Sequence, residues 1–433
     1  MKVSLLHFLF SCTRIVVTLL SVGLISDQVY ASPTLFRVNP IGGDFRLFYS
    51  ALGPLRLEDT SSINQTLSQE LNQSNTSGML TARFKLKGAL SRFKWEIHPL
   101  LLSRPQSGSS TVSLNANPSQ FPQALPLSVD LVDSKNQLAQ LRADRFLVTR
   151  EFTDFKITLG RQAITLGQGR AFTPLDRLAP FSPTSIDQQY KPGLDALRLD
   201  YWWGVAGQLS LIAAYRQDWT QSGMAYVITG QDHFAGWDFH FVIGSFQKDR
   251  VVGFSTAGSL GAISIYGDFA WTWSSPDLIQ ADDEETFGRA TLGMTWTWAE
   301  AGGGHINGEV YWQEDGASNT DLYLSETQDP RFLRGERWFL ARFYGMLSIQ
   351  QALTPLFQAA VSLLTNLEDG SGLIGSNFVW SVGQDVDVVI GGYGGYGDGL
   401  SISAMALTPT PLTTQSEFGA LKWMGFAMMA TYF

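Results

Sequence analysis

Alternation of polar and apolar residues, repeated in segment after segment, is the feature that most constrains the fold of this chain. In the segment 80–87 the even positions are apolar, whereas Arg83, Lys85 and Lys87 stand at odd positions, and the segment 92–98 repeats the pattern. Because successive side chains of a strand point to opposite faces, we predict strands with one apolar and one polar face. After the first thirty residues no window sustains a helical period.

We count about eighteen such segments, and the connections between them are mostly short and long by turns. The weakest segment, 223–230, is included because an even strand number returns both termini to the same side. Short turns on one side and long loops on the other are typical of bacterial outer-membrane barrels, and we find no repeat of the kind that a propeller or solenoid would show. The segments are 44–51, 79–88, 92–102, 143–152, 154–163, 194–202, 206–216, 223–230, 237–247, 250–257, 261–273, 286–298, 304–313, 337–350, 356–366, 373–382, 386–396 and 417–433.

Composition indicates which face of these strands meets water. Charged residues make up only 16% of the chain, whereas soluble proteins average about 25%. Tryptophan residues gather near the predicted strand ends, which suits the aromatic girdles of a membrane barrel. We therefore predict an all-β fold, a single closed antiparallel transmembrane β-barrel over residues 32–433, with apolar faces toward lipid and polar faces toward a wet lumen. The alternative is a soluble sandwich with an aromatic core.

Both ends of the chain carry features of an exported protein. Residues 1–31 are predicted to be a signal peptide, because Lys2 and Arg14 precede an apolar run that is too short to span a membrane. The single cysteine, Cys12, lies within it. Phe433 ends the last predicted strand, and bacterial outer-membrane barrels typically finish with such an aromatic residue, which the barrel-assembly machinery recognises. We expect a protein of the bacterial outer membrane, in contact with its lipid and lipopolysaccharide.

The middle of the chain carries the most specific motif. Gly160-Arg161-Gln162 ends a predicted strand and leads through Phe172-Thr-Pro-Leu-Asp-Arg177 into a long loop. Over about 140–215, and at the C-terminus, the chain resembles the Gram-negative porins of the alginate-export type. That resemblance implies a single-chain barrel with a charged lumen. The long acidic loops depart from the family and argue against a polyuronate substrate.

The loop 164–193 is predicted to fold into the lumen and narrow the pore. Its charges alternate in sign and four prolines restrict its backbone. A loop of this length needs partners that hold it, and charged wall residues would supply them. The alternative is an external loop held by its own ion pairs. The predicted constriction residues are Arg161, Arg170, Asp176, Arg177, Asp187 and Lys191.

Arg161 conflicts with strict alternation. It shares a face with Ile157 and Leu159, and an arginine facing lipid at mid-depth costs about 2–4 kcal/mol. It therefore lies either at a rim or behind a β-bulge at Gly160 that turns it inward, and we favour the bulge.

Charge is unevenly distributed along the chain. Residues 80–200 carry 16 basic and 10 acidic side chains, whereas residues 201–433 carry 9 and 24. We expect a basic wall that attracts anions and an acidic array formed by Asp200, Asp268 and Glu309 that faces it. The alternative is that the loops simply differ in charge. The predicted pore-lining residues are Arg83, Lys85, Lys87, Lys94, Glu96, Lys156, Gln162, Arg198, Asp200, Asp268, Arg289, Glu309 and Arg342.

Together these features predict a monomeric passive pore, and not an enzyme, for a small polar solute, with anions favoured. The histidines have no metal-ligand spacing, and the glycine-rich stretch 392–397 lacks a βαβ unit, so we expect neither a metal nor another cofactor. Basic residues spread over strands do not form a nucleic-acid face. Two alternatives remain, a polysaccharide-export barrel fed by periplasmic partners and a surface hydrolase that uses a histidine.

Overall fold

The computed structural model describes residues 36–39, 41–56, 74–105, 124–134, 137–181, 190–215, 224–246, 248–275, 285–333, 336–402 and 412–433. The predicted signal peptide lies outside the described residues. Strands dominate the rest, as the two-residue periods require. The strands of the main ring are β2 (Gly42–Leu52), β3 (Asn75–Leu90), β4 (Phe93–Pro105), β6 (Gln137–Glu151), β7 (Phe155–Gln162), β8 (Leu194–Trp203), β9 (Gly207–Tyr215), β10 (Met224–Phe234), β11 (Trp237–Phe246), β12 (Asp249–Leu260), β13 (Ile263–Trp273), β14 (Thr286–Trp298), β15 (Gly304–Gln313), β16 (Phe343–Thr354), β17 (Phe357–Asn366), β18 (Gly372–Gly383), β19 (Val386–Tyr396) and β22 (Trp423–Tyr432).

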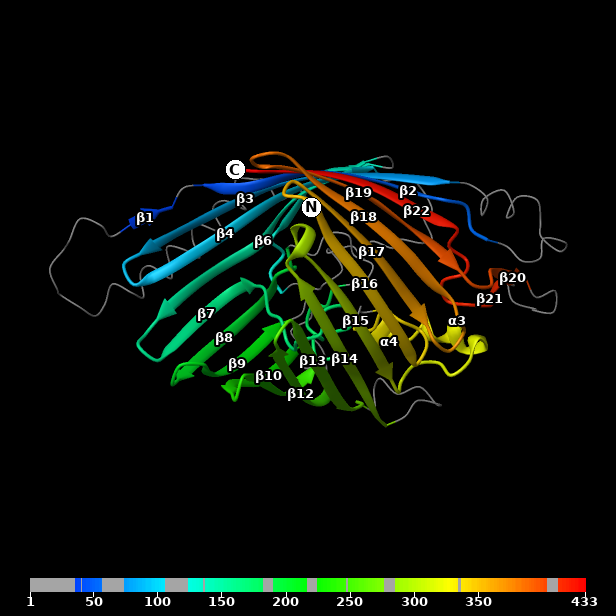
Figure 1. Ribbon diagram of the computed structural model, residues 1–433. Helices are drawn as coiled ribbons and strands as arrows, with labels where there is room; N and C mark the ends of the chain where they lie inside the picture. Colours follow the sequence, from blue (N-terminus) through cyan, green and yellow to red (C-terminus); the bar gives the residue numbers. More distant parts are fainter. Residues whose placement is uncertain are drawn as a thin grey trace.

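The last strand of the chain closes the sheet into a ring. The sheet has 20 strands, of which β1 (Phe36–Val38) and β5 (Ser128–Ser134) are short additions beside β3 and β6, so 18 strands form the ring. β22 pairs with β19 on one side and with β2 on the other, and Figure 1 shows red β22 beside blue β2. The predicted closed antiparallel barrel is confirmed. The weakest predicted segment forms β10, which pairs with both β9 and β11.

The two ends of the barrel differ in their connections. At one end, the short-turn rim, neighbouring strands are joined by turns of two to five residues, and the ring also starts and finishes there. At the other end, the loop rim, most connections are longer, although 247–248 and 367–371 are short. The helices α3 (Tyr323–Glu326) and α4 (Pro330–Leu333) lie in a loop-rim connection. None of the helices in the described ranges is long and apolar enough to cross a membrane.

Two strands begin six residues later than predicted. β16 starts at Phe343 and not at 337, and β22 starts at Trp423 and not at 417. The residues before them join a buried cluster at the loop rim, in which Phe339 and Leu340 take part and Phe418 packs against it. Burial in that cluster does not follow a two-residue period. The apolar residues of the loop were therefore predicted, wrongly, to be part of the strands that follow them. The strand predicted over 250–257 is also longer than expected, because β12 continues to Leu260.

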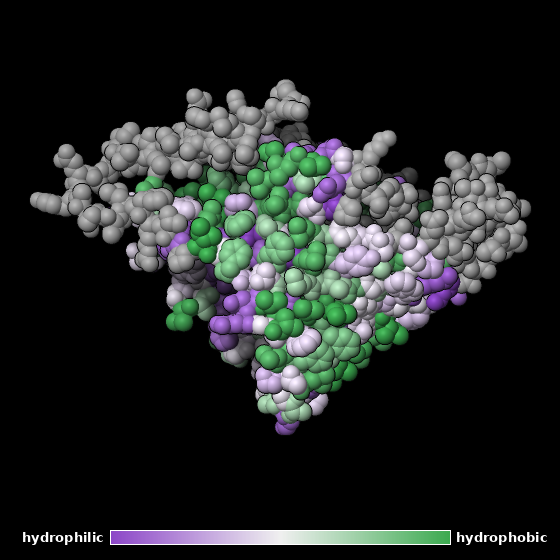
Figure 2. Space-filling view, turned by 90° about the horizontal axis from the view of Figure 1, so that it is seen from above, coloured by the Kyte–Doolittle hydropathy of each residue, from purple (hydrophilic) through white to green (hydrophobic). Residues whose placement is uncertain are grey.

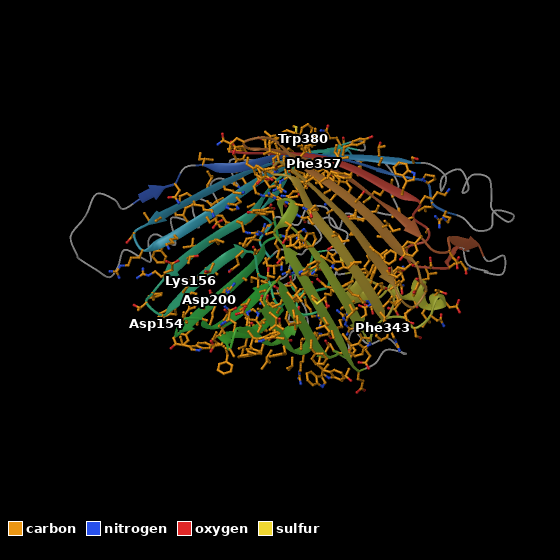
Figure 3. All side chains as sticks on the ribbon, in the orientation of Figure 1. Asp154, Lys156, Asp200, Phe343, Phe357 and Trp380 are labelled. Atoms are coloured by element: carbon orange, nitrogen blue, oxygen red, sulfur yellow. The ribbon has the colours of Figure 1, made fainter. Side chains whose placement is uncertain are left out.

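Apolar side chains cover the outside of the ring. On β15, Val310 is 54% exposed whereas its neighbour Glu309 is 2% exposed. Figure 2 shows apolar side chains over much of the face seen from above, with smaller hydrophilic patches among them. Figure 3 shows Phe357 and Trp380, which pair across β17 and β18, near one end of the strands and Phe343 near the other. Aromatic residues therefore stand near both rims, as the girdle prediction requires.

Candidate functional site: the lumen and its inner loop

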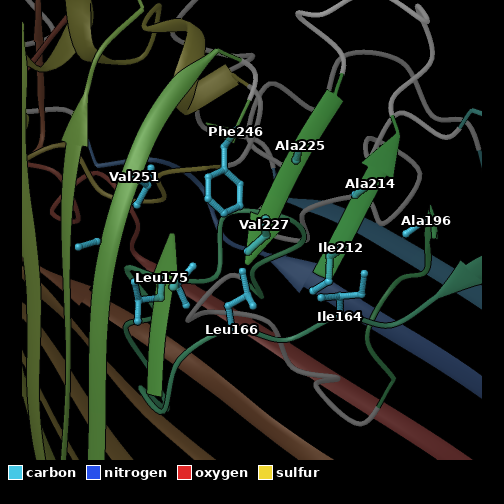
Figure 4. Packing of buried hydrophobic residues seen from close by; sticks show 12 residues of the cluster. Ile164, Leu166, Leu175, Ala196, Ile212, Ala214, Ala225, Val227, Phe246 and Val251 are labelled. Atoms are coloured by element: carbon cyan, nitrogen blue, oxygen red, sulfur yellow. The ribbon is translucent and has the colours of Figure 1, made fainter. Parts of the chain in front are cut away.

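The connection from β7 to β8, which we call the inner loop, is described at 163–181 and 190–193. Its segment 163–181 lies against the inside of the barrel wall. Its side chains Ile164, Leu166 and Leu175 are buried in one apolar cluster with inward-facing side chains of β8 to β13 (Figure 4). These wall residues occupy the face opposite to the exposed apolar residues of the same strands. In this sector the expectation of a polar lumen face is wrong, because the loop and not water covers the wall. The wall residues are Ala196, Ile212, Ala214, Ala225, Val227, Val242, Phe246, Val251 and Ala270.

Two carboxylates of the wall bind the backbone of this loop. Asp268 on β13 accepts the N–H groups of Gln168 at 2.8 Å and of Gly169 at 3.0 Å. Glu309 on β15 accepts the N–H groups of Ala171 and Phe172, each at 3.0 Å. Hydrogen bonds to a charged acceptor are stronger than neutral ones, and these satisfy donors that would otherwise be buried without partners. Both residues were predicted to line the pore, and the structure places them beneath the inner loop.

Gly167 permits this close approach. Its φ of +85° is a conformation that residues with a side chain rarely adopt, and a Cβ there would lie 2.4 Å from Oδ2 of Asp268. Because the carboxylate is already bound to two loop N–H groups, it has little freedom to move away. The glycine at position 167 is therefore explained by the close contact between the loop backbone and the wall.

An aromatic anchor continues the attachment of the loop. Phe172 is buried and stacks on Tyr311 of β15 with ring centroids 5.0 Å apart. Phe339 from the loop-rim connection lies 5.4 Å from Phe172, and Tyr344 of β16 completes the group. Offset ring pairs add stability beyond the area that they bury. The inner loop is thus attached to the wall from β8 around to β16.

The charged residues of the loop have separate partners. Arg177 donates to Asp249 of β12 at 3.2 Å and to Glu336 of the loop-rim connection at 2.9 Å. Lys191 pairs with Asp176 inside the loop. Burial raises the pKa of the Asp176 carboxyl, and Lys191 opposes that rise. Both expected modes of attachment, wall pairs and internal pairs, therefore occur together.

Two further constriction predictions have different outcomes. Arg170 remains exposed, donates to Thr295 at 2.8 Å and lies over the ring of Tyr266. Asp187 lies outside the described residues.

Arg161 is fully buried at the loop end of β7. It forms two 2.9 Å hydrogen bonds with the carboxylate of Asp195 on β8 and donates to the carbonyl oxygens of Ala143 and Leu125. The bulge predicted at Gly160 is wrong, since the pairing of β7 with β6 and β8 runs through Arg161 without a register shift. This arginine is tolerated because it lies at the end of the strand, where neighbouring parts of the chain cover its ion pair with Asp195.

Basic residues gather on the wall that lies across the ring from β13. Arg83 on β3 binds the carboxylates of Asp44 on β2 and Asp144 on β6, each at 3.0 Å. Lys85 approaches Asp44 at 3.5 Å. Three further arginines complete this group, which we call the basic wall. They are Arg46, Arg142 and Arg145.

Those three arginines and both carboxylates were not predicted from the sequence. A register shift between His98 and Pro99 of β4 leaves Asp144 as an extra residue on β6. The bulge brings Arg142 and Arg145 to Asp144, although strict alternation would not place the three side chains together. The dense run Arg142-Ala-Asp-Arg145 was the available signal.

Toward the short-turn rim the charges form smaller groups. Lys87 and His98 both contact Glu96, at 3.1 and 2.7 Å. Lys94 pairs with Glu151. On the neighbouring strands Asp200 accepts from Arg198 at 2.6 Å and approaches Lys156 at 3.4 Å. Figure 3 shows Lys156 and Asp200 close together near Asp154 of the adjacent turn. The facing acidic array is thus wrong for Asp200, which lies among cations.

The remaining predicted pore-lining residues lie away from an open wall. Gln162 donates to the carbonyl of Ala196 at 3.0 Å and is buried. Arg289 is bound to Asp315 of the loop-rim connection, and Arg342 lies in that connection, donating to the carbonyl of Gly316 at 3.0 Å. The side chains of Arg289 and Arg342 are therefore bonded to the loop-rim connection, and that of Gln162 is bonded to the backbone of β8.

Two acids of the loop-rim connections have opposite electrostatic surroundings. Burial alone would raise the pKa of Asp315, but Arg289 and Arg337 hold it well below its usual range. Burial raises the pKa of Glu417 to about 8, and Asp369 adds to the rise. The latter carboxyl accepts hydrogen bonds from Tyr344, Leu340 N and Asn366. No group of three or more metal-ligating side chains gathers among the described residues.

Comparisons with known proteins define the class by its architecture. No protein-family model matches the chain, and a search of curated proteins finds no match. Among solved structures, Pseudomonas aeruginosa OccK11 (OpdR) matches with a TM-score of 0.53 and 7% identity, over 92% of this chain and 95% of that chain. Acinetobacter baumannii OccAB3 gives 0.53 and 9%, over 92% and 99%. Acinetobacter baumannii OccAB1 gives 0.50 and 9%, over 90% and 96%.

These likenesses concern the fold alone. The protein is a closed antiparallel 18-strand β-barrel with a loop laid against its inner wall. Within that class its architecture is similar to OccK11 and OccAB3. The predicted porin-like barrel is confirmed, and these matches do not single out the alginate-export type.

Proposed function

We propose that this protein is a channel of the bacterial outer membrane through which small polar solutes, anions in particular, diffuse passively. The observation that carries the proposal is the unequal charge of the inner wall. The basic wall has five cations, Arg46, Arg83, Lys85, Arg142 and Arg145, around the two carboxylates of Asp44 and Asp144. Across the ring, Asp268 and Glu309 are engaged by the inner loop. An anion at the basic wall therefore meets net positive charge.

Four cations are placed to act on a passing solute. The side chains of Lys85, Lys87, Lys156 and Arg198 are 34%, 50%, 30% and 27% exposed. Charges of one sign on low-dielectric walls raise the local concentration of counter-ions. Passage also requires that each contact be weak enough to release the solute, and partly solvated lysines meet that condition. The buried arginines contribute to the potential and the lysines make the contacts.

We also propose the family, the assembly signal, the cleavage site and the oligomeric state that the sequence predicts. Membership of the alginate-export-type porins is supported by the segment 140–215, while the acidic loops favour a solute smaller than a polyuronate. Phe433 supports recognition by the assembly machinery, since it is exposed and packs edge-on against Phe84 with centroids 5.9 Å apart. We further propose cleavage after residue 31, a monomeric barrel and no enzymatic activity.

Planar bilayers test the proposal. The purified protein should give discrete channels whose reversal potential in a KCl gradient shows a preference for chloride. The double substitution Lys85→Gln with Lys87→Gln should reduce that preference, whereas Lys94→Gln, which removes a charge paired with Glu151 at the rim, should change it less. Absence of any channel current contradicts the channel itself. An unchanged reversal potential in the double variant contradicts the role given to the exposed lysines Lys85 and Lys87.

A further inference from the structure

One aromatic side chain of the inner loop is inserted into the basic wall. The ring centroid of Tyr190 lies 3.6 Å from Cζ of Arg83 and 4.7 Å from Cζ of Arg145, and Nζ of Lys85 is 5.9 Å away. The Tyr190 hydroxyl is hydrogen-bonded to Nδ1 of His98. Four wall side chains from β3, β4 and β6 thus surround one ring.

This arrangement defines a site by its chemistry. Guanidinium groups stack on aromatic faces, and both arginines are only 8% exposed, so the attraction is little weakened by water. The ring also helps to shield the guanidinium groups of Arg83 and Arg145 from solvent, and it does not neutralise their charge. Because a neutral phenol supplies a ring face and no charge, the basic wall retains its excess of three positive charges with Tyr190 in place.

A ring that carries a negative charge would satisfy this site better than Tyr190 does. Its face would take the positions between Arg83 and Arg145, and its carboxylate would meet the uncompensated cations. Resting on the proposed channel function, we propose that the basic wall contains a binding site for aromatic organic anions, that Tyr190 occupies it when no solute is bound, and that Tyr190 thereby sets the affinity of the channel for such solutes.

Tyr190 and an aromatic anion would compete for the same site in the basic wall. When only a fraction of the sites is vacant, the apparent dissociation constant of a ligand is the intrinsic constant divided by that fraction. Removing the ring of Tyr190 should therefore tighten the binding of an aromatic anion. Keeping the ring but removing its hydroxyl should leave most of the competition in place, because the contacts with the arginines remain.

The experiment measures the concentration of 4-hydroxybenzoate that halves the KCl current through single channels in planar bilayers. Tyr190→Ala should lower this concentration about tenfold relative to the unmodified protein, as expected if about nine sites in ten are self-occupied. Tyr190→Phe should stay within about twofold, because a phenyl ring still competes. Tyr201→Ala is the matched control, since Tyr201 is exposed on the outer face near the short-turn rim.

The saturated analogue 4-hydroxycyclohexanecarboxylate separates ring recognition from charge. Its half-blocking concentration should not fall in Tyr190→Ala. An equal gain for both probes would overturn the aromatic site and leave a general attraction for anions, and no gain for 4-hydroxybenzoate would overturn competition by Tyr190. If Tyr190→Ala does not assemble, Arg145→Gln provides the second test and should raise the half-blocking concentration for the aromatic probe only. KCl current without probe reports on the channel function independently.

Discussion

The carboxylate of Asp268 accepts the backbone N–H of Gln168 at 2.8 Å, although the two residues are 100 positions apart in the sequence. Through this contact and its counterpart at Glu309, the barrel wall fixes the path of the inner loop. Acidic side chains that would otherwise repel anions are turned into attachment points. The loop therefore covers two carboxylates that would otherwise face the lumen.

Replacing Asp268 by alanine should loosen the inner loop. Two buried N–H groups would lose their acceptor, at a cost of about 1–3 kcal/mol each. We expect single-channel conductance to become larger or to fluctuate, with the barrel still assembled. Asp238→Ala is the control, because Asp238 lies at the start of β11 with its side chain 60% exposed. Steady wild-type conductance in Asp268→Ala would show that the carboxylate does not hold the loop.

Gly167→Ala should have a similar effect through sterics. The substitution combines an unfavourable φ with a Cβ too close to Oδ2 of Asp268, so the loop must leave its present path. Protease cleavage within 163–181 should become faster than in the unmodified protein. At Gly345 no heavy atom lies within 4 Å of an added Cβ, so Gly345→Ala should cleave at the original rate. Equal rates for all three proteins would count against the contact.

A charge on the outer face should impair assembly. Leu292 on β14 is 59% exposed on the apolar side, and arginine there should cost about 2–4 kcal/mol if that side meets hydrocarbon. The folded fraction, read from the heat-dependent mobility of the barrel in detergent gels, should fall. Gln350→Arg on the inner face of β16 should assemble normally. A normal folded fraction for Leu292→Arg would place the outer face in water.

The order of the loop rim should depend on pH through Glu417. Its folded pKa of about 8 lies above the ordinary value of 4.5, so the unfolded segment ionises first as pH rises. Stability of this contact is therefore complete below pH 4.5 and is lost progressively up to pH 8. Exchange protection of the 417–421 amides, corrected for intrinsic rates, should fall across that range.

Glu417→Gln should remove most of this pH dependence, because the amide does not ionise. In that variant Leu340 N can still donate to Oε1, and the amide NH2 that replaces Oε2 can donate to the Tyr344 hydroxyl. Protection that is constant with pH in the original protein, or that declines equally in the variant, would mean that another group is responsible.

The strands were predictable from the sequence because a two-residue period is a local property. Even β10, the weakest segment, follows the parity that a closed barrel with both ends on one side requires. The apolar outer face and the aromatic rims follow from the same local pattern. The inner loop was expected to enter the lumen, since its length and charges needed partners.

The exact use of the charges could not be predicted, because it depends on contacts between distant strands. Arg289 and Glu309 have the inward parity of pore-lining residues, yet both hold loops. Asp144 departs from parity at a bulge whose position no local pattern reveals. Tyr190 was visible only as one residue of a long loop, and its place between Arg83 and Arg145 comes from tertiary structure.

Cysteine labelling tests most directly the central claim that water fills the inside of this barrel and hydrocarbon surrounds it. Ser362 and Val361 are neighbours on β17, and their side chains point inward and outward, with Val361 54% exposed on the apolar face. In a chain with Cys12 replaced by serine, each is changed to cysteine and treated in lipid vesicles with a membrane-impermeant, water-soluble thiol reagent. We predict rapid labelling at 362 and protection at 361. Rapid labelling at 361 with protection at 362 would contradict the claim.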